Sequence, residues 1–168
     1  MSPSRHGILP AVLIVDDNPV DRLLATTAFR KAEVANPVVE LTDGDELMEY
    51  LLRSGRYASR GEPSGAMVIL LDINMPRKTG LEALAEIKAH PELKRIPVIM
   101  LTTSDAERDI VRSYGLGANA FITKPIGFTE FLDVVKNLAR FWLSSVTLPP
   151  TPCAASPQAA AASASGTS

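Results

Sequence analysis

Cysteine is nearly absent from this sequence, which has a single one, Cys153, among 168 residues. One cysteine permits neither an intrachain disulfide nor a metal site made of several cysteines, and it fits a reducing, cytosolic setting. Long apolar runs are absent too. The longest, Ile8–Val15 and Met67–Leu71, are far shorter than the roughly 20 residues that cross a bilayer, and two acidic residues follow the first run where a signal peptide has its cleavage site. We therefore expect a cytoplasmic protein with no membrane partner.

Neither sign of charge is in large excess. The 17 basic and 19 acidic residues give a net charge of −2, so the chain lacks the strongly basic surface that binds nucleic acids or anionic membranes. We expect no nucleic-acid partner.

Aromatic residues are few, 5 % of the chain, and none lies at its end. Residues Pro150 to Ser168 comprise seven Ala, four Ser and three Pro among 19 residues and carry no charge, a composition that cannot anchor a core. About 149 residues remain, enough for one core but too few for two ordinary domains. We expect a flexible N-terminus over residues 1–8, one domain over 9–143, a C-terminal arm over 144–150 and a disordered tail over 151–168.

Five short apolar runs alternate with segments of helical period. Four runs contain almost no polar residue, as expected of parallel strands with both faces covered, whereas Glu40 interrupts the second. The runs are Ala11–Val15, Val38–Leu41, Met67–Leu71, Pro97–Leu101 and Ala120–Ile122. This order predicts an α/β fold, a five-stranded parallel sheet that is doubly wound, (βα)5, with its site at the carboxyl ends of the strands.

Start and stop residues mark the helices between these strands. The last helix has the longest apolar stripe, from Phe128 to Trp142, and the segment 54–66 is expected to be a long surface loop. The expected signals are Pro19 at the start of the first helix, Asp43 and Thr79 as caps of the second and third, Ser104 or Asp105 as the cap of the fourth, and Gly115 or Gly117 as its end.

Polar side chains follow four of the five strands where they end. They are Asp16 and Asp17, Asp72, Thr102 with Thr103, and Lys124. Each one alone would be interpreted as a helix cap or a solvated side chain. Their convergence changes that interpretation, because two carboxylates about 4 Å apart repel by roughly 4 kcal/mol at an effective dielectric near 20. One lysine cannot balance three carboxylates, so we expect a hard divalent cation, and Mg²⁺ fits best because it accepts few carboxylates, several waters and a phosphate oxygen.

This chemistry favours phosphoryl transfer. The attacking group must be a carboxylate or a hydroxyl, and Asp72 is the better candidate because its strand lies centrally in the expected sheet. A phosphoryl group on Asp72 would meet the metal, Lys124 and Thr102, which stabilise charge on its oxygens. Gly80 is expected to relieve crowding near this site.

Four motifs together, DD after the first run, LLDINMP, LTTS and ITKP, resemble the signature of the receiver domain of two-component response regulators, which has a flavodoxin-like fold. The resemblance covers Leu9 to about Leu143. Within that family, the segment LTTSDAERDIVRSYGLGANAFITKP, the loop before the third strand and FWLSSVTLP are similar to the stand-alone regulators paired with cyanobacterial and bacterial phytochromes.

The resemblance implies that Asp72 accepts a phosphoryl group from a sensor histidine kinase, here of the phytochrome type. It implies that Mg²⁺ is coordinated by Asp17, Asp72 and the backbone carbonyl of Asn74, while Asp16 acts through water and Lys124 pairs with the phosphoryl group or with Asp72. Such a protein is not an enzyme in the ordinary sense, because it catalyses only its own phosphotransfer and a slow dephosphorylation.

The resemblance also implies a switch made of Thr102 and Phe121. On activation the Thr102 hydroxyl turns toward the phosphoryl group, Phe121 rotates inward, and the surface of the fourth helix, fifth strand and fifth helix signals to partners. Thr103 stands where a small residue is common and would narrow access, and Phe121 replaces a frequent tyrosine. The Lys124–Pro125 peptide bond is expected to be cis.

An apolar segment, FWLSSVTLPP, follows the last core helix. Its large side chains would leave an exposed patch in a monomer, and such a patch often marks an interface. They are Phe141, Trp142, Leu143, Val146 and Leu148. We predict a homodimer in which this arm extends the last helix or reaches onto the partner. The alternative is that the arm folds back on its own domain.

Three other functions compete with the phosphate-accepting receiver. A receiver could act as a phosphate-independent scaffold. An aspartyl phosphatase of the haloacid dehalogenase type needs a second aspartate two residues after its nucleophile, where this chain has Asn74. A nucleotide-binding switch needs a glycine-rich phosphate loop, and the turn after the first strand is DDNP instead.

Overall fold

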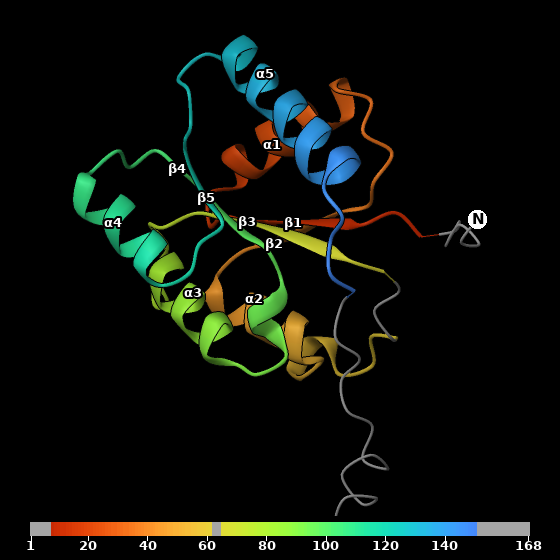
Figure 1. The fold of residues 1–168 in the computed structure, drawn as a ribbon, viewed down its shortest axis with the longest axis vertical. Coiled ribbons are helices and arrows are strands. Elements are labelled where there is room, and N and C mark those ends of the chain that lie inside the picture. The colour runs from red at the N-terminus through yellow and green to blue at the C-terminus, as the bar shows by residue number, and fades with distance from the viewer. Residues whose placement is uncertain (1–7, 62–64, 151–168) are drawn as a thin grey trace, which may run out of the picture.

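Five parallel strands form one sheet in the order β2-β1-β3-β4-β5. The computed structural model describes residues 8–61 and 65–150, so residues 1–7 of the predicted N-terminal segment and the tail 151–168 lie outside the described residues. The strands are β1 (Ala11–Val15), β2 (Val38–Leu41), β3 (Met67–Leu71), β4 (Val98–Thr102) and β5 (Ala120–Thr123). The predicted doubly wound parallel sheet, with β3 at its centre, is confirmed (Figure 1).

Helices pack on both faces of the sheet. Figure 1 shows α1 and α5 over one face and α2 and α3 over the other, with α4 beyond them. The helices are α1 (Pro19–Lys31), α2 (Gly44–Leu52), α3 (Gly80–Ala89), α4 (Glu107–Gly115) and α5 (Phe128–Leu138), with two short 3₁₀ turns, η1 (Gly55–Tyr57) and η2 (Leu93–Arg95), and a π-helix, η3 (Ala139–Ser145). None of them, within the described ranges, is long and apolar enough to cross a membrane. The predicted surface loop over residues 54–66 contains η1.

Each face of the sheet buries its own apolar cluster, because alternate side chains of a strand point to opposite faces. Leu13 and Ile69 pack with α2 and α3, whereas Val12 and Val68 pack with α1 and α5. All four are at most 2 % exposed. β1 and β3 pair in register, so that their last residues lie opposite each other. The residues that follow these two strands therefore start side by side at one edge of the sheet.

The ends of β4 and β5 differ slightly from the prediction. β4 starts one residue later than expected, because Pro97 has no N–H and joins the ladder only through its carbonyl, which accepts from the Ile69 N–H. At the other end, β4 includes Thr102, which lies opposite Thr123 of β5. Thr102 is thus held in the sheet itself and not in the loop that follows.

Two of the predicted helix caps are confirmed and one is wrong. Asp43 accepts a hydrogen bond from the Glu46 N–H, and Thr79 caps α3 in the same way. The fourth helix is capped by neither Ser104 nor Asp105, because it begins only at Glu107. The Ser104 hydroxyl instead donates to Asp109 at 2.6 Å.

The end of α4 agrees with the prediction. The helix stops at Gly115, and Gly117 has a φ of +102°, which strains any residue with a Cβ.

The Lys124–Pro125 peptide bond is trans, since the described residues contain no cis peptide bond. The expectation of a cis bond is therefore wrong. Proline lowers the preference for trans without reversing it, so the sequence Lys-Pro alone does not decide the isomer.

The arm after α5 folds back on its own domain. The helix widens into the π-helix η3, which turns Trp142 and Leu143 toward the cluster between α1, α5 and the sheet, and Leu148 joins them there. The premise that these side chains form an exposed patch is therefore wrong. Trp142, Leu143, Val146 and Leu148 are each partly buried, whereas Phe141 is 57 % exposed.

Candidate functional site

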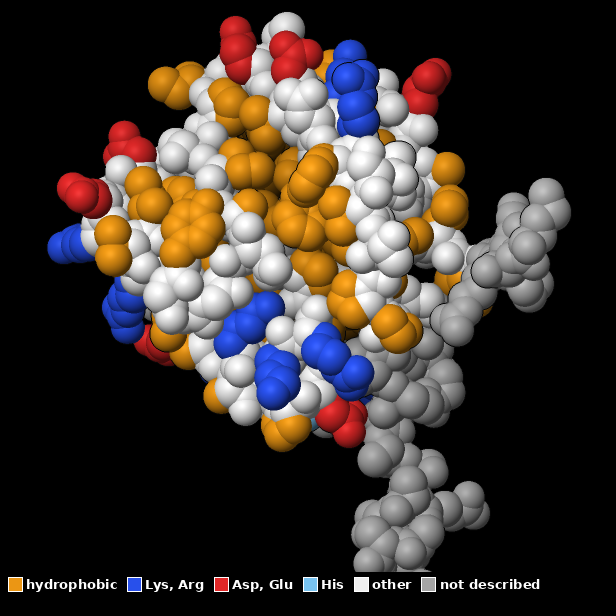
Figure 2. Space-filling model, in the orientation of Figure 1, with side chains coloured by type: hydrophobic (Ala, Val, Ile, Leu, Met, Phe, Trp, Pro, Cys, Tyr) orange, Lys and Arg blue, Asp and Glu red, His pale blue; other side chains and the backbone are white. Residues whose placement is uncertain are grey.

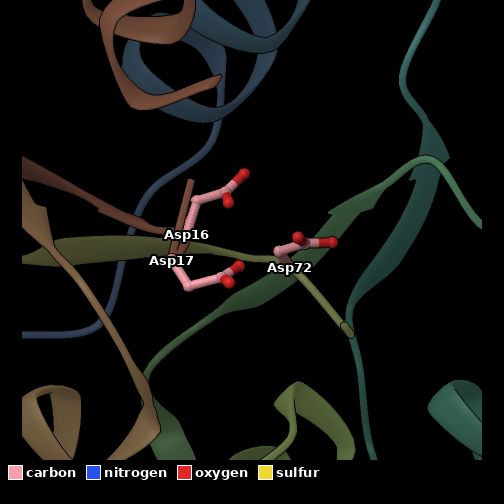
Figure 3. A group of neighbouring side chains, drawn as sticks. All are labelled: Asp16, Asp17 and Asp72. Carbon is pink, nitrogen blue, oxygen red and sulfur yellow. The ribbon is translucent and has the colours of Figure 1, made fainter. Parts of the chain in front are cut away.

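Three carboxylates meet where β1 and β3 end. Asp16, Asp17 and Asp72 each place a carboxylate oxygen within 4.8 Å of the other two, and Figure 3 shows the three side chains gathered off the ends of these strands. Asp16 and Asp72 are 3 % and 9 % exposed, whereas Asp17 is open to solvent. The register of the two strands produces this meeting, so the cluster predicted from the strand ends is present.

Both carboxylate oxygens of Asp16 already accept hydrogen bonds. Oδ1 accepts from the Asn18 N–H at 3.0 Å and Oδ2 from the Lys124 ammonium at 2.6 Å. The Arg22 guanidinium donates to the Asp16 backbone carbonyl at 2.7 Å, which fixes the start of the loop after β1. Lys124 was expected to pair with Asp72 or a phosphoryl group. In this structure its ammonium instead donates to Asp16 Oδ2.

The ionised form of Asp72 is disfavoured. Burial raises the pKa of Asp72 above its usual range, and the negative charge of Asp16 acts in the same direction. The Thr102 hydroxyl, the Lys124 charge and the Ile73 N–H, which donates to Asp72 Oδ1 at 2.9 Å, oppose this rise in pKa without cancelling it. Added positive charge at the cluster would therefore stabilise the Asp72 carboxylate.

Gly80 is needed where α3 passes the site. A Cβ at this position would lie 1.9 Å from the Asp72 carbonyl oxygen, so any side chain would push the backbone of Asp72 away. The Gly80 N–H donates to the Ile73 carbonyl at 2.9 Å. The expectation that Gly80 relieves crowding is confirmed. Asn74 lies in the same loop and is exposed.

Thr102 and Phe121 occupy different places relative to the cluster. Thr102 is fully buried, its hydroxyl interacts with the Asp72 carboxylate, and its Oγ1 accepts from the Ser104 N–H at 3.3 Å. Thr103, by contrast, is exposed. Phe121 is half-buried against the apolar cluster under α2 and α3. Its N–H donates to the hydroxyl of Tyr114 on α4 at 3.2 Å.

Sequence reasoning missed Arg22 and Tyr114. Arg22 could have been suspected only as a basic residue one helical turn into α1. No sequence pattern indicates the contact of Tyr114, because its partner is a backbone N–H on another element. The predicted residues of the acidic cluster, Thr102 and Lys124 come together, whereas the arm residues lie away from them.

The side chains at this rim fit a hard divalent cation. All the available donors are oxygens, two of the three carboxylates are buried, and the one ammonium near them, among the residues described, is Lys124. Carboxylates in such a number suit Mg²⁺ or Mn²⁺ and not a soft metal.

A doubly wound sheet of this strand order, with an acidic cluster, a hydroxyl and a lysine at the ends of its strands, is the flavodoxin-like receiver fold. Residues 12–136 match the family model described as the response regulator receiver domain. The chain therefore belongs to the response regulator receiver domain family, and the haloacid dehalogenase interpretation has no support.

Its relatives include regulators linked to phytochromes. The chain is 39 % identical over 138 residues to the response regulator Rcp1 of Synechocystis sp., covering 82 % of this chain and 92 % of Rcp1. It also resembles the structure of the phosphorylated cyanobacterial phytochrome response regulator RcpA, with 44 % identity, a TM-score of 0.76 and coverage of 84 % and 99 %. The Mn²⁺-bound form of Rcp1 matches with 38 % identity, a TM-score of 0.75 and coverage of 83 % and 99 %.

Proposed function

We propose that this response regulator receiver accepts a phosphoryl group on Asp72 from a phosphohistidine of a sensor kinase. The observation that carries the proposal is the position of the Asp72 carboxylate, which lies among two other carboxylates and close to a buried hydroxyl and an ammonium. A nucleophile needs negative charge, and the phosphoryl oxygens need donors. This rim of the sheet offers both.

In the transfer, an oxygen of Asp72 forms a bond to phosphorus while the bond from phosphorus to the histidine nitrogen breaks. The electron pair of that bond stays on the imidazole. The Thr102 hydroxyl and the Lys124 ammonium then donate to oxygens of the phosphoryl group, which stabilises their charge. Lys124 exchanges its present acceptor, Asp16, for a phosphoryl oxygen in this step.

The cation we assign to this site is Mg²⁺. Asp17, Asp72 and the backbone carbonyl of Asn74 would coordinate it, and Asp16 would reach it through water, since both Asp16 oxygens already accept hydrogen bonds. When bound, the ion supplies positive charge against the carboxylates and the phosphoryl oxygens. The Mn²⁺-bound form of Rcp1 supports a divalent cation in a close relative.

Phosphorylation becomes a signal through Thr102 and Phe121. A phosphoryl group that draws the Thr102 hydroxyl toward itself changes the packing next to Phe121 on the neighbouring strand β5. The Phe121 N–H donates a hydrogen bond to the hydroxyl of Tyr114 on α4, so a movement of Phe121 would displace α4. The surface of α4, β5 and α5 then shifts between two states, of which phosphate favours one.

The partner kinase we propose is of the phytochrome type, and the relationship to RcpA and to the bacteriophytochrome response regulator AtBRR supports this. The protein would meet that kinase in the cytoplasm, which its cysteine usage fits. Its own catalysis would be limited to phosphotransfer and slow hydrolysis of the phosphoryl group.

We also propose a homodimer, whose contact is a groove that includes Phe141 and Trp142 of the arm. An open, mostly apolar groove lies between β5 and α5, lined by Ile122, Val134, Leu138, Phe141 and Trp142. Figure 2 shows that apolar side chains gather on the face of the molecule turned toward the viewer. A groove of this kind, with an exposed aromatic at its edge, suits a second copy of the chain.

Incubation with Mg²⁺ and a small phosphodonor tests the central claim. The wild-type protein should gain one phosphoryl group, seen by intact mass and stable in acid but labile in base, and Asp72→Asn should gain none. An adduct in both proteins would show that Asp72 is not the acceptor. No adduct in either would favour the phosphate-independent scaffold.

A further inference from the structure

Two basic side chains connect the loop between β3 and α3 to the start of α2. This loop begins with Asp72 and contains Asn74. Arg77 Nη2 donates to Asp43 Oδ2 at 3.0 Å, and Lys78 Nζ lies 3.5 Å from Asp45 Oδ1. The loop that carries two of the proposed cation ligands is thus tied to a helix that has no residue in the acidic cluster.

Asp43 holds its side of the tie firmly. Its Oδ1 caps α2 by accepting from the Glu46 N–H at 2.8 Å, while its Oδ2 accepts from Arg77. The Asp43 side chain is only 12 % exposed, whereas that of Arg77 is 73 % exposed. The helix therefore fixes the carboxylate, and the carboxylate in turn positions the guanidinium.

Arg77 has a backbone conformation that arginine does not favour. Its φ is +64°, in the left-handed region where a side chain crowds the following carbonyl. Residues keep such a conformation when their surroundings hold them in it. The contact that the structure gives to the Arg77 side chain is the ion pair with Asp43, so without that pair the loop is expected to relax.

The start of α2 is also shaped to receive the loop. A Cβ on Gly44 would lie 2.8 Å from Lys78 Cγ, so the lysine stem fills the space that a side chain of the first helical residue would need. Beyond this point the Lys78 ammonium pairs with Glu86 on α3. The loop therefore lies against α2 through packing as well as through charge.

We propose that Arg77 is a positioning residue for the cation of the acidic cluster. Through Asp43, it holds the loop in the conformation that presents the Asn74 carbonyl to a cation bound by Asp17 and Asp72. This inference rests on the proposed function, because it needs a cation at the cluster. It assigns a role in that function to α2, which the acidic cluster itself does not include.

A positioning role for Arg77 and simple electrostatics predict different effects of substitutions on the affinity for the cation. If charge alone mattered, Arg77→Gln would remove a positive charge near a cation site and tighten cation binding, while Asp43→Asn would remove a negative charge and weaken it. If the pair positions the loop, both substitutions weaken binding. Asn keeps an acceptor oxygen for capping α2, so Asp43→Asn breaks the ion pair and spares the cap.

The experiment measures the Kd of Mn²⁺ for the full chain by isothermal titration, together with urea unfolding to show that each variant is folded. Arg77→Gln and Asp43→Asn should each raise the Kd about fivefold, and the double variant should raise it less than the product of the two. Arg77→Lys, which keeps a cation near Asp43, should bind more tightly than Arg77→Gln. Arg56→Gln is the matched control, because Arg56 is also an exposed arginine paired with a carboxylate of α2, Glu49 at 3.0 Å, but it does not belong to the loop between β3 and α3, and its loss should leave the Kd unchanged.

Asp17→Asn separates this inference from the proposed function. If Asp17→Asn loses Mn²⁺ while Arg77→Gln binds as well as the wild type or better, the positioning role of Arg77 is wrong and the cation site stands. If Asp17→Asn binds like the wild type, the cluster is not the cation site, and both claims fail.

Discussion

Lys124 and Asp16 form a largely buried ion pair, 2.6 Å between Nζ and Oδ2, with 14 % and 5 % of their side chains exposed. The pair joins the end of β5 to the end of β1, although β3 and β4 lie between these strands in the sheet. The pair therefore holds the end of β5 close to the end of β1 before any phosphoryl group arrives.

Lys124→Met should destabilise the protein, because it leaves the Asp16 carboxylate buried without its cation. Removal of one partner of a buried pair costs about 3 kcal/mol. We expect a loss of that order in the free energy of unfolding, measured by urea denaturation in EDTA, and a smaller loss in Mg²⁺, since a bound cation would replace the missing charge. Phosphorylation by a small phosphodonor should also slow down. An equal loss of stability with and without Mg²⁺ would contradict a cation at this cluster.

Asp72→Asn should have the opposite effect on stability when no divalent cation is present. Burial and the neighbouring Asp16 raise the pKa of Asp72, so at neutral pH its ionised carboxylate opposes folding. The amide removes this charge, and we expect the free energy of unfolding in EDTA to increase by on the order of 1 kcal/mol. In Mg²⁺ the difference should shrink or reverse, because the ion stabilises only the folded wild type. A destabilised Asp72→Asn protein in EDTA would show that the charges at the rim are already balanced.

Gly80→Ala should strongly slow phosphorylation, although it removes no functional group. The new methyl group would lie 1.9 Å from the Asp72 carbonyl oxygen, so the nucleophile or the start of α3 must move, and a displacement of about 1 Å at a catalytic group can cost on the order of a hundredfold in rate. Gly115→Ala is the matched control. Gly115 also lies in a helix, and a Cβ there has nothing within 4 Å, so this variant should be phosphorylated at the wild-type rate. Equal rates for the two variants would refute the steric argument.

Ionisation of Tyr57 should lower the stability of the folded protein at alkaline pH. Its hydroxyl donates to Glu46 Oε1 at 2.7 Å, and this hydrogen bond raises the pKa of Tyr57 from 10.0 to about 12. Because the folded state holds the proton more tightly, the stabilisation is complete below pH 10 and disappears as the pH rises through about 12. Tyr57→Phe should therefore cost about 2 kcal/mol at neutral pH, and the two proteins should converge in denaturant titrations at the alkaline limit. A constant difference at every pH would exclude ionisation of Tyr57 as the cause.

The sequence predicted the parts of this protein that depend on short-range patterns. The short apolar runs, one of them interrupted by Glu40, located all five strands, and Asp43 and Thr79 located two helix starts, because capping is a local interaction. The acidic cluster also followed from the sequence, since the ends of parallel strands meet at one edge.

Contacts between distant elements could not be predicted in this way. No local pattern distinguishes Asp16 from Asp72 as the acceptor for Lys124, nor indicates that Arg77 reaches Asp43, 34 positions earlier. The arm was misjudged for a related reason. Apolar residues past the last helix indicate burial, but they do not tell whether the surface that covers them belongs to the same chain or to another.

Phe141 and Trp142 allow that last question to be tested, because adjacent aromatic residues of the arm face different surroundings. Phe141 is 57 % exposed, while Trp142 packs into the cluster between α1, α5 and the sheet. Phe141→Ser should leave the free energy of unfolding nearly unchanged but weaken self-association, seen as a shift toward the monomer in sedimentation velocity. Trp142→Ala should cost on the order of 2 kcal/mol of folding stability, because Trp142 is only partly buried, and it should also weaken self-association, because Trp142 lines the groove. If Phe141→Ser sediments like the wild type, the groove between β5 and α5 is not the dimer contact; if Trp142→Ala is as stable as the wild type, the arm does not depend on its own domain for burial.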